Sequence, residues 1–396
     1  MPIPTPFHER TLPLCRGMRW KDWAGYHAVC SFDTCHESEY YALRHACGMI
    51  DVSPLFKYEV KGPDASAFLS RVMTKNIKKL KVGQVTYCCW CDDHGKIVDD
   101  GTVTRMNEQE YRVTAAEPSY AWLSMYTRGY QVEVTDISAD YGILSIQGPS
   151  SRGLVAAATD SAIDTLKFFR LTQTKLGKAE VMITRTGYTG DLGYEVWIKR
   201  EDCLQGWDTL MDQGKNYGLR PAGLDAMDVT RIEAGFVMNG VDYFSAHHCL
   251  LESRKSSPYE LGLGWTVNLN RSTFNGQAAL RAEKEKGPEW LFRGIEMDWE
   301  SFEEVCAGYG LPPAVGSAAW RDGIPLYDLN GSWIGYASSG AWSPQLKKNL
   351  ALATLKTPHA EPGTEIQMEV TLEYRRHKVL AHVVETPFYN PERKRS

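Results

Sequence analysis

The most informative stretch of this chain reads Arg185-Thr-Gly-Tyr188-Thr-Gly-Asp191-Leu-Gly-Tyr194-Glu195-Val-Trp197, where three glycines and two tyrosines precede a carboxylate at the start of an apolar strand. Glycine permits positive φ and a close approach of the backbone to a ligand. Tyr188 and Tyr194 could stack on a flat ring, and Glu195 could accept a pair of N–H donors. A Gly-rich hairpin turn that leads into a buried strand has the same pattern. By itself, the stretch is compatible with both a binding loop and a turn.

Length and charge limit the classes of protein to consider. A chain of 396 residues exceeds what one core usually supports, so we expect two or three domains. Its 44 basic and 49 acidic residues are mixed along the chain, which gives no basic stripe for nucleic acid and no polybasic membrane anchor. The N-terminus lacks an export signal, and no segment approaches the ~18 apolar residues of a membrane span. We expect a cytoplasmic protein with a small-molecule partner, and neither nucleic acid nor membrane.

The ten cysteines are expected to be free thiols, because nothing in the sequence directs the chain to an oxidising compartment. Cys88, Cys89 and Cys91 are close enough in sequence to suggest a metal site. Their segment is β-prone, however, and adjacent strand residues point to opposite faces, so the three thiols cannot meet one ion. We therefore predict buried strand thiols and no metal.

Two successive α+β units are expected before the last third of the chain. The first has a helix over 38–50, a strand at 55–61, a helix at 65–73 with Asp64 as N-cap, and strands near 84–91, 97–105 and 110–115. The second has a strand at 143–146, a helix at 150–158, and strands near 167–172, 179–184 and 194–199. A strand, a Gly-Pro turn and a helix occur at 57–72 and again at 143–158, which suggests a weak internal repeat.

The remaining segments predict two helices and a small β-barrel. Helices are expected at 202–217 and from Pro221 to about Ala234. The charge-rich segment 282–287 is expected at a domain boundary, and the strand-rich pattern beyond Phe292, with a hairpin at 323–338, fits a barrel. The predicted domains are residues 1–140, 141–284 and 285–396.

Taken in order, several segments resemble the glycine-cleavage T-protein (aminomethyltransferase) family, which uses tetrahydrofolate to accept one-carbon groups. The matching segments are Trp23-Ala-Gly-Tyr26, Gly48-Met-Ile-Asp51-Val-Ser53, Val60-Lys-Gly-Pro63, Gly95-Lys-Ile-Val-Asp99-Asp100, Gln147-Gly-Pro149, 185–195, Arg231-Ile-Glu-Ala-Gly235, Glu260-Leu-Gly-Leu-Gly-Trp265, Ser343-Pro344 and Asn349-Leu-Ala-Leu-Ala353. The resemblance implies an α+β fold, a three-domain cloverleaf with a C-terminal β-barrel domain. Its first two domains would be folate-binding halves, with the pterin buried in a central channel and the glutamyl tail pointing outward.

The resemblance also implies a set of tetrahydrofolate-binding residues: Tyr87, Asp100, Val113, Tyr188, Glu195 and Trp265. The edge of a reduced pterin presents an amino group and ring N–H donors, which a carboxylate such as Glu195 can accept as a pair. Asp100 would lie near N5, where it can orient the folate and handle charge or a proton. Its neighbour Asp99 would face away, since adjacent strand residues point to opposite sides. Arg231 is expected to form a buried ion pair with Glu233 or another nearby carboxylate.

Three departures from the family pattern indicate a changed substrate side. Met227 stands where the family has an arginine, Ala115 stands where it has an asparagine, and the segment 239–258 is longer, aromatic and histidine-bearing. We therefore predict a demethylase that moves a methyl group from a small methylated donor to N5 of tetrahydrofolate. The donor would be a methoxy-aromatic acid or a sulfonium or ammonium compound.

The candidate substrate residues are Tyr26, Tyr243, His247 and His248, and Tyr243 and His247 join Asp100 as candidate catalytic residues. Two alternatives stay open. One is an aminomethyltransferase that receives its group from a lipoylated carrier protein. The other is a non-enzymatic, folate-binding iron–sulfur assembly factor. The second is disfavoured because the loop 186–191 lacks the cysteine found in such relatives.

Overall fold

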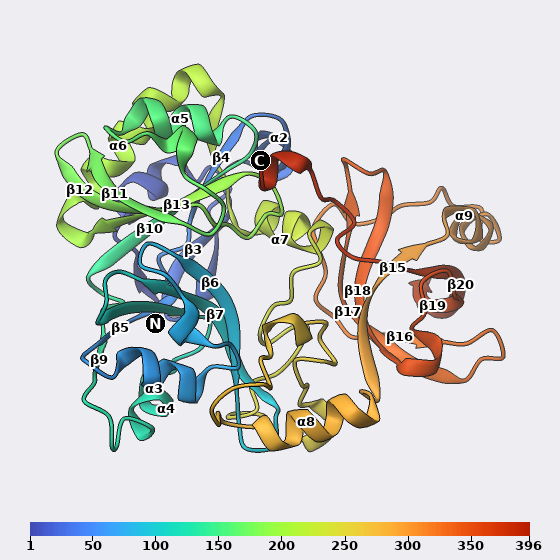
Figure 1. Ribbon diagram of the computed structural model, residues 1–396. Helices are drawn as coiled ribbons and strands as arrows, with labels where there is room; N and C mark the ends of the chain where they lie inside the picture. Colours follow the sequence, from blue (N-terminus) through green and yellow to red (C-terminus); the bar gives the residue numbers. More distant parts are fainter.

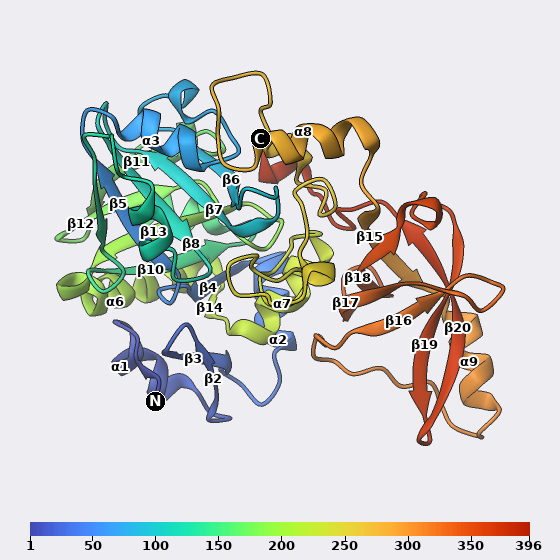
Figure 2. The same ribbon diagram turned by 90° about the horizontal axis from the view of Figure 1, so that it is seen from below.

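The computed structural model describes residues 1–396 and consists of two α/β lobes with a β-barrel beside them (Figure 1). Figure 2, seen from below, shows the barrel again next to the two lobes. A small mixed sheet at the N-terminus precedes the two lobes, with strand order β1-β3-β2. Its elements are β1 (Ile3–Pro4), α1 (His8–Thr11), β2 (Arg19–Trp23) and β3 (Tyr26–Ser31).

The first lobe is a five-stranded sheet in the order β6-β7-β8-β5-β9. Its elements are β5 (Phe56–Lys61), α3 (Ala65–Val72), β6 (Val85–Cys91), β7 (Ile97–Arg105), β8 (Glu110–Ala115), α4 (Tyr120–Met125) and β9 (Glu133–Asp136). One face of the sheet packs Trp90, Val103 and Val113 with Phe68 of α3. Alternate strand residues point to opposite sides, so the opposite face of the sheet carries the other set of side chains, among them the predicted site residues of β6 and β7. Asp64 precedes α3 as expected, but its side chain accepts a hydrogen bond from the Gln131 N–H and does not cap the helix.

The second lobe is a six-stranded sheet in the order β11-β12-β13-β10-β4-β14. Its elements are α2 (Glu37–His45), β4 (Cys47–Asp51), β10 (Tyr141–Gln147), α5 (Ser151–Ala158), β11 (Leu171–Leu176), β12 (Ala179–Thr184), β13 (Gly193–Lys199), α6 (Cys203–Gly214) and β14 (Leu219–Pro221). Leu144, Val196 and Ile198 pack against Leu154 and Trp207 of the two covering helices. β4 comes from the N-terminal part of the chain, so this sheet joins distant segments.

The predicted internal repeat is confirmed by the strand order. In the first lobe the chain runs β5, α3, β6, β7, β8, and in the second it runs β10, α5, β11, β12, β13. Both sheets contain these strands in the same antiparallel order, β6-β7-β8-β5 and β11-β12-β13-β10. The Gly-Pro turn occupies the same place in each copy, between the first strand and its helix.

The helix predicted over 38–50 is wrong in its second half. The helix ends at His45, and Cys47–Asp51 forms β4 between β10 and β14. Residues 47–50 are all buried. A strand covered on both faces is a continuous apolar run, which sequence pattern alone does not separate from a buried helix.

A long connection leads from the second lobe to the barrel. It begins with α7 (Leu224–Glu233) and ends with α8 (Gln277–Lys286). The charge-rich segment expected at a boundary is the end of α8, and the first barrel strand begins at Trp290.

The C-terminal barrel is closed, with strand order β15-β18-β17-β16-β19-β20. Its elements are β15 (Trp290–Met297), α9 (Trp299–Ala307), β16 (Ile324–Tyr327), β17 (Trp333–Ser343), β18 (Lys348–Lys356), β19 (Glu365–Leu372) and β20 (Arg375–Val384). The predicted hairpin is the antiparallel pair β16 and β17, which confirms that part of the prediction. The α+β fold with a C-terminal barrel is therefore confirmed.

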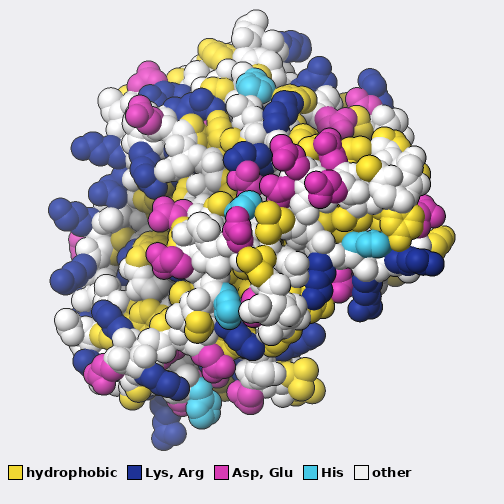
Figure 3. Space-filling model, turned by 90° about the vertical axis from the view of Figure 1, so that its right-hand side faces the viewer, with side chains coloured by type: hydrophobic (Ala, Val, Ile, Leu, Met, Phe, Trp, Pro, Cys, Tyr) yellow, Lys and Arg dark blue, Asp and Glu magenta, His cyan; other side chains and the backbone are white.

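The surface and the cysteines agree with the composition. Acidic and basic side chains are interspersed on the barrel side of the molecule (Figure 3). None of the helices is long and apolar enough to cross a membrane. All ten cysteines are free thiols, and Cys88, Cys89 and Cys91 are buried as predicted.

Candidate active site

The carboxylate of Asp100 is held between two tyrosine hydroxyl groups. The Tyr87 hydroxyl donates to Asp100 Oδ2 at 2.7 Å, and the Tyr243 hydroxyl donates to Oδ1. Tyr87 and Asp100 share a face because Tyr87 pairs with Thr102 across β6 and β7, and Asp100 pairs with Cys89. No lysine or arginine forms an ion pair with Asp100. Burial raises the pKa of Asp100, while the two tyrosine hydrogen bonds act in the opposite direction.

Asp99 does not face away from this cluster, contrary to expectation. Its Oδ1 accepts hydrogen bonds from Asn239 Nδ2 and from the Asp100 N–H, each at 2.9 Å, and lies 3.5 Å from the Tyr243 hydroxyl. Asp99 is fully buried, and burial together with the charge of Asp100 raises its pKa well above the ordinary value. The pairing of β6 with β7 is regular at Asp99 and Asp100 and shifts only beyond them, between Trp90 and Cys91. Asp99 therefore fixes the loop that carries Tyr243.

Tyr243 comes from the long segment 239–258. The Gly240 N–H donates to the Tyr243 carbonyl at 2.8 Å, which closes a tight turn and points the phenol toward Asp100. Burial raises the pKa of Tyr243 well above its ordinary value, and the nearby charge of Asp100 adds to this effect. The hydroxyl group therefore stays protonated at neutral pH and acts as a donor.

Glu195 lies on the second lobe, at the start of β13. Thr186 Oγ1 donates to its Oε2 at 2.6 Å, and Thr184 Oγ1 lies 3.5 Å from the same oxygen. The side chain is half-buried, and burial raises the pKa of Glu195. As at Asp100, the partners are hydroxyl groups and no cation is present. Each carboxylate therefore keeps lone pairs available for a ligand's N–H groups.

The glycines of the 185–197 stretch make room for a neighbouring side chain. A Cβ at Gly193 would lie 2.1 Å from Gln147 Oε1, and a Cβ at Gly187 would lie 2.2 Å from the same atom. Gln147 Nε2 donates to the Thr186 carbonyl at 3.2 Å, so the amide pins the loop. Tyr194, one of the two predicted stacking residues, is fully buried in the core of the second lobe and cannot stack on a ligand. Only Tyr188 is placed for that role.

The other predicted cofactor residues lie at different depths. The Tyr188 hydroxyl donates to the Val237 carbonyl at 2.5 Å, and its ring packs against Phe236. Trp265 is 60% exposed and stacks on Tyr87 with ring centroids 5.9 Å apart. The side chain of Val113 is fully buried in the core of the first lobe, on the face away from Asp100.

Three of the predicted substrate residues lie outside the Asp100 cluster. His247 and His248 are exposed, and their rings contact each other at 4.7 Å. Tyr26 is half-buried in the N-terminal sheet, where it pairs with Trp23 and Ile3. None of the three side chains makes a hydrogen bond to Asp100, Tyr87 or Tyr243. Their roles stay predictions that no contact supports.

Sequence reasoning missed several residues that complete the site. Thr184 and Thr186 bond Glu195, Gln147 pins its loop, and Asn239 bonds Asp99. Thr184, Thr186 and Gln147 stand in or beside quoted motifs, but their partners depend on strand register, which the sequence does not give.

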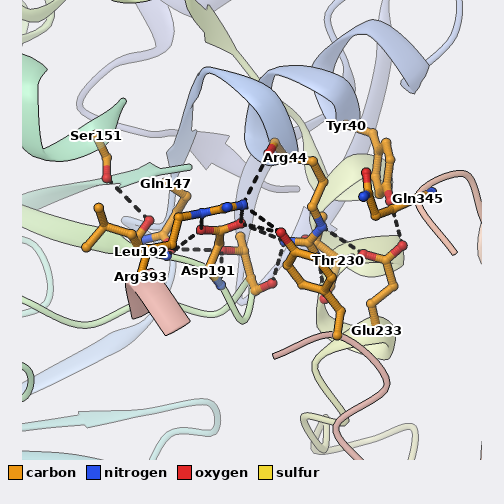
Figure 4. Close-up of polar contacts among 12 residues, drawn as sticks. Tyr40, Arg44, Gln147, Ser151, Asp191, Leu192, Thr230, Glu233, Gln345 and Arg393 are labelled. Carbon is orange, nitrogen blue, oxygen red and sulfur yellow. Dashed lines mark hydrogen bonds and ion pairs between the residues drawn. The ribbon is translucent and has the colours of Figure 1, made fainter. Parts of the chain in front are cut away.

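A buried ion-pair network also holds the glycine-rich loop 185–195 in place (Figure 4). Arg393 makes two hydrogen bonds to Asp191, at 2.7 and 2.8 Å, and Arg44 Nη1 lies 3.8 Å from Asp191. Arg44 also pairs with Glu233 at 2.5 Å, and the Tyr40 hydroxyl donates to Glu233 at 2.6 Å. The contacts join α2, the glycine-rich loop, α7 and the C-terminal segment into one unit.

Arg231 forms a separate buried ion pair, as expected. Its partners are Asp228 at 2.8 Å and Asp242 at 2.6 Å, both neighbouring carboxylates. Glu233, the other expected partner, is taken by Arg44.

The two sheets present carboxylates whose only side-chain partners are hydroxyl groups, and a C-terminal barrel lies beside them. The family model described as "GCVT N-terminal domain" matches residues 13–271. A second model, described as "Glycine cleavage T-protein C-terminal barrel domain", matches residues 310–390. The aminomethyltransferase of Halothermothrix orenii is 34% identical over 354 residues, which is 88% of this chain and 90% of that protein. The aminomethyltransferase of Symbiobacterium thermophilum is 32% identical over 402 residues, 99% of this chain and 98% of that protein.

The chain therefore belongs to the glycine-cleavage T-protein (aminomethyltransferase) family. The crystal structure of the glycine cleavage system aminomethyltransferase T from Bartonella henselae has the same fold, with a TM-score of 0.83 at 23% identity, covering 98% of this chain and 99% of that one. Tetrahydrofolate is the one-carbon acceptor of the family. The hydrogen-bond acceptors present fit the N–H donors of a reduced pterin, since Glu195 and Asp100 offer lone pairs that no cation occupies.

Proposed function

We propose that this protein transfers an aminomethyl-derived one-carbon unit to tetrahydrofolate, receiving it from a lipoylated carrier protein. The observation that carries this proposal is the pair of carboxylates, Asp100 and Glu195, on facing sheets with only hydroxyl partners. Relatives that match nearly the whole chain at 32–34% identity are named aminomethyltransferases, which supports this donor over a methylated small molecule.

Glu195 would anchor the pterin. With Thr186 and Thr184 donating to one oxygen, Oε1 and the remaining lone pairs can accept paired N–H groups. Such charge-assisted pairs contribute about 1.5–3 kcal/mol and fix orientation.

Asp100 would act at the reacting end of the folate, where N5 accepts the one-carbon unit. Its raised pKa brings the carboxyl group closer to the working pH, so it can hold a proton or stabilise positive charge. Tyr87 and Tyr243 would orient the carboxylate, and Tyr243 could donate its proton to a leaving group. Fixed geometry of this kind is itself a large source of rate.

A second candidate function is methyl transfer from a small methylated donor, the function first indicated by the sequence. It is favoured by Met227, which is 5% exposed and apolar where the family has an arginine, and by Ala115, which is 1% exposed. Apolar side chains at these two positions would suit a methylated donor better than a carrier arm with an amino group. The names of the relatives favour the first function, so methyl transfer ranks second.

One experiment separates the two functions. Purified protein is incubated with tetrahydrofolate and either an aminomethyl-loaded lipoylated carrier or a panel of methoxy-aromatic acids and sulfonium compounds. Mass spectrometry of the folate then identifies the unit received. Release of ammonia with the carrier supports aminomethyl transfer, whereas a methylated folate formed only with the small donors would replace it. Tight folate binding with no transfer from either donor class would favour the non-enzymatic alternative.

A further inference from the structure

A pocket of about 410 Å³ lies between the two facing sheets, outside the Asp100 cluster. Its lining comes from β8, β10 and the three strands β11 to β13, which lie on the side of the molecule away from the barrel (Figure 2). The proposed function does not use this pocket. Its charges and its unpaired donors nevertheless point to a ligand.

Side chains on the second lobe form three successive rows on the face of the crevice. Glu195 pairs with Thr184 in the first row, and Trp197 pairs with Met182 in the second. Lys199 lies in the third row, two residues further along β13. Residues two apart share a face and lie about 7 Å apart along a strand, so the rows run about 13 Å from carboxylate to ammonium.

The third row is cationic at both edges. Val181 pairs with Ile198, which brings Glu180 beside Lys199, and Glu180 also pairs with Lys175 across β11. Lys175, Lys199 and Glu180 are exposed at the rim of the pocket.

The first lobe repeats this polarity. Thr104 pairs with Arg112, which therefore shares a sheet face with Asp100, four residues before Thr104 on β7. The Arg112 guanidinium lies 4.5 Å from the Tyr141 ring centroid and 5.7 Å from that of Trp197. Both walls of the crevice therefore run from an acidic end to a basic end and meet at the pocket.

Two buried donors in the pocket have no partner. Arg112 Nη2 donates to the Tyr141 hydroxyl at 3.0 Å, but Arg112 Nε is buried and unbonded. Trp197 is 2% exposed, and its indole Nε1 is also unbonded. An unpaired buried donor is costly, and a bound acceptor would remove that cost. A ligand carboxylate is an acceptor that suits either nitrogen.

We propose that this pocket binds a carboxylate-bearing small molecule, with one carboxylate facing Arg112 Nε and Trp197 Nε1 and a second at the Lys199 ammonium on the rim. Two sources supply this chemistry. One is the glutamyl end of a folate whose ring lies at Glu195, and this source rests on the proposed function. The other is a separate small dicarboxylate, which does not.

The test uses the full chain with 15N-labelled tryptophan and glutarate as the probe. Addition of glutarate is expected to shift the Trp197 indole N–H resonance saturably, while the other indole signals stay in place. Arg112→Met is expected to weaken glutarate binding by about 10-fold or more, because it removes a charge-assisted hydrogen bond. Arg128→Met, at an exposed arginine outside the pocket, is the matched control and is expected to have no effect.

A second arm distinguishes the two sources. Tetrahydrofolate with one or three glutamyl residues is added to the glutarate complex. Displacement of glutarate that is stronger with three glutamyl residues assigns the pocket to the folate tail. Folate and glutarate bound at the same time assign it to a separate dicarboxylate. Loss of folate binding alone would count against the proposed function and leave the glutarate result intact.

Trp197→Phe keeps the aromatic packing and removes only the N–H donor, so it guards against misfolding of the arginine variant. It is expected to weaken glutarate binding several-fold. If millimolar glutarate shifts no indole signal of the wild-type protein, and Arg112→Met leaves the affinities for both folates unchanged, the proposal is overturned.

Discussion

Asp191 and Glu195 lie four residues apart in the same glycine-rich segment, yet their surroundings differ completely. Asp191 is buried between Arg393 and Arg44, and its charge is neutralised by guanidinium groups. Glu195 has only threonine hydroxyl groups as partners and stays half-buried in the crevice. The partner of a carboxylate, more than its burial, therefore separates a structural role from a binding role.

Arg44→Met is expected to have the largest effect, because it leaves Glu233 buried without its cation. Removing one partner of a buried ion pair typically costs about 3–5 kcal/mol of unfolding free energy. Urea unfolding measures this loss, with Arg128→Met as an exposed control that should change stability by less than about 0.5 kcal/mol. A loss below about 1 kcal/mol would mean that the network does not hold α2, the glycine-rich loop and α7 together.

Asp100→Asn is expected to reduce the transfer rate by about 10²–10³-fold, since proton handling and charge stabilisation contribute on this scale. Stability should not fall, because no cation is left unpaired. Steady-state assays and unfolding curves on the same preparation check both halves. Asp93→Asn, at an exposed neighbour, is the control. Full activity in the Asp100 variant would remove its assigned role.

Glu195→Gln is expected to weaken tetrahydrofolate binding by about 10–100-fold, which corresponds to one or two charge-assisted hydrogen bonds. Calorimetric titration measures the affinity, and Glu201→Gln, an exposed carboxylate after the same strand, should leave it unchanged. An unchanged affinity in the Glu195 variant would place Glu195 with Asp191, as a structural residue.

The pH dependence of stability should separate the two kinds of carboxylate. Burial raises the pKa of both Asp100 and Glu195. Acids with raised native pKa values bind protons more tightly when folded, so their contribution to stability is lost as pH rises through those values. An Asp100→Asn, Glu195→Gln double variant should therefore gain stability relative to wild type between about pH 4 and pH 8. A gap between the two proteins that shrinks over this range would contradict the assignment.

His247→Ala and His248→Ala are expected to have the smallest effects. Both imidazole rings are exposed and lack bonds to the Asp100 cluster, so each variant should keep the transfer rate within about twofold and stability within about 0.5 kcal/mol. A tenfold loss of rate with either donor would restore the sequence-based prediction that these histidines face the substrate.

Local patterns in the sequence predicted much of the fold. The strands β6, β7 and β8 fall at the expected positions, and the barrel hairpin and the repeat of strand, Gly-Pro turn and helix are present. These features depend on alternation and on turn residues within a short window. The strand at 47–51 was not predicted because the two strands that pair with it, β10 and β14, come from distant parts of the chain.

The residues of the candidate site also divide into those that the sequence indicated and those that only distant contacts bring in. The resemblance to the family indicated Asp100, Tyr87 and Glu195, and the long segment 239–258 indicated Tyr243, because motif order and segment length can be seen in the sequence. The packing of the chain brings Tyr243 to Asp100, places Asp99 beside them and leaves His247 and His248 outside, and none of these contacts follows from the sequence pattern. It also decided that Asp191 meets arginines while Glu195 meets threonines. The partners of these residues lie on other strands, and strand register decides which side chains meet. A shift of one residue in that register would turn each side chain to the other face of its sheet.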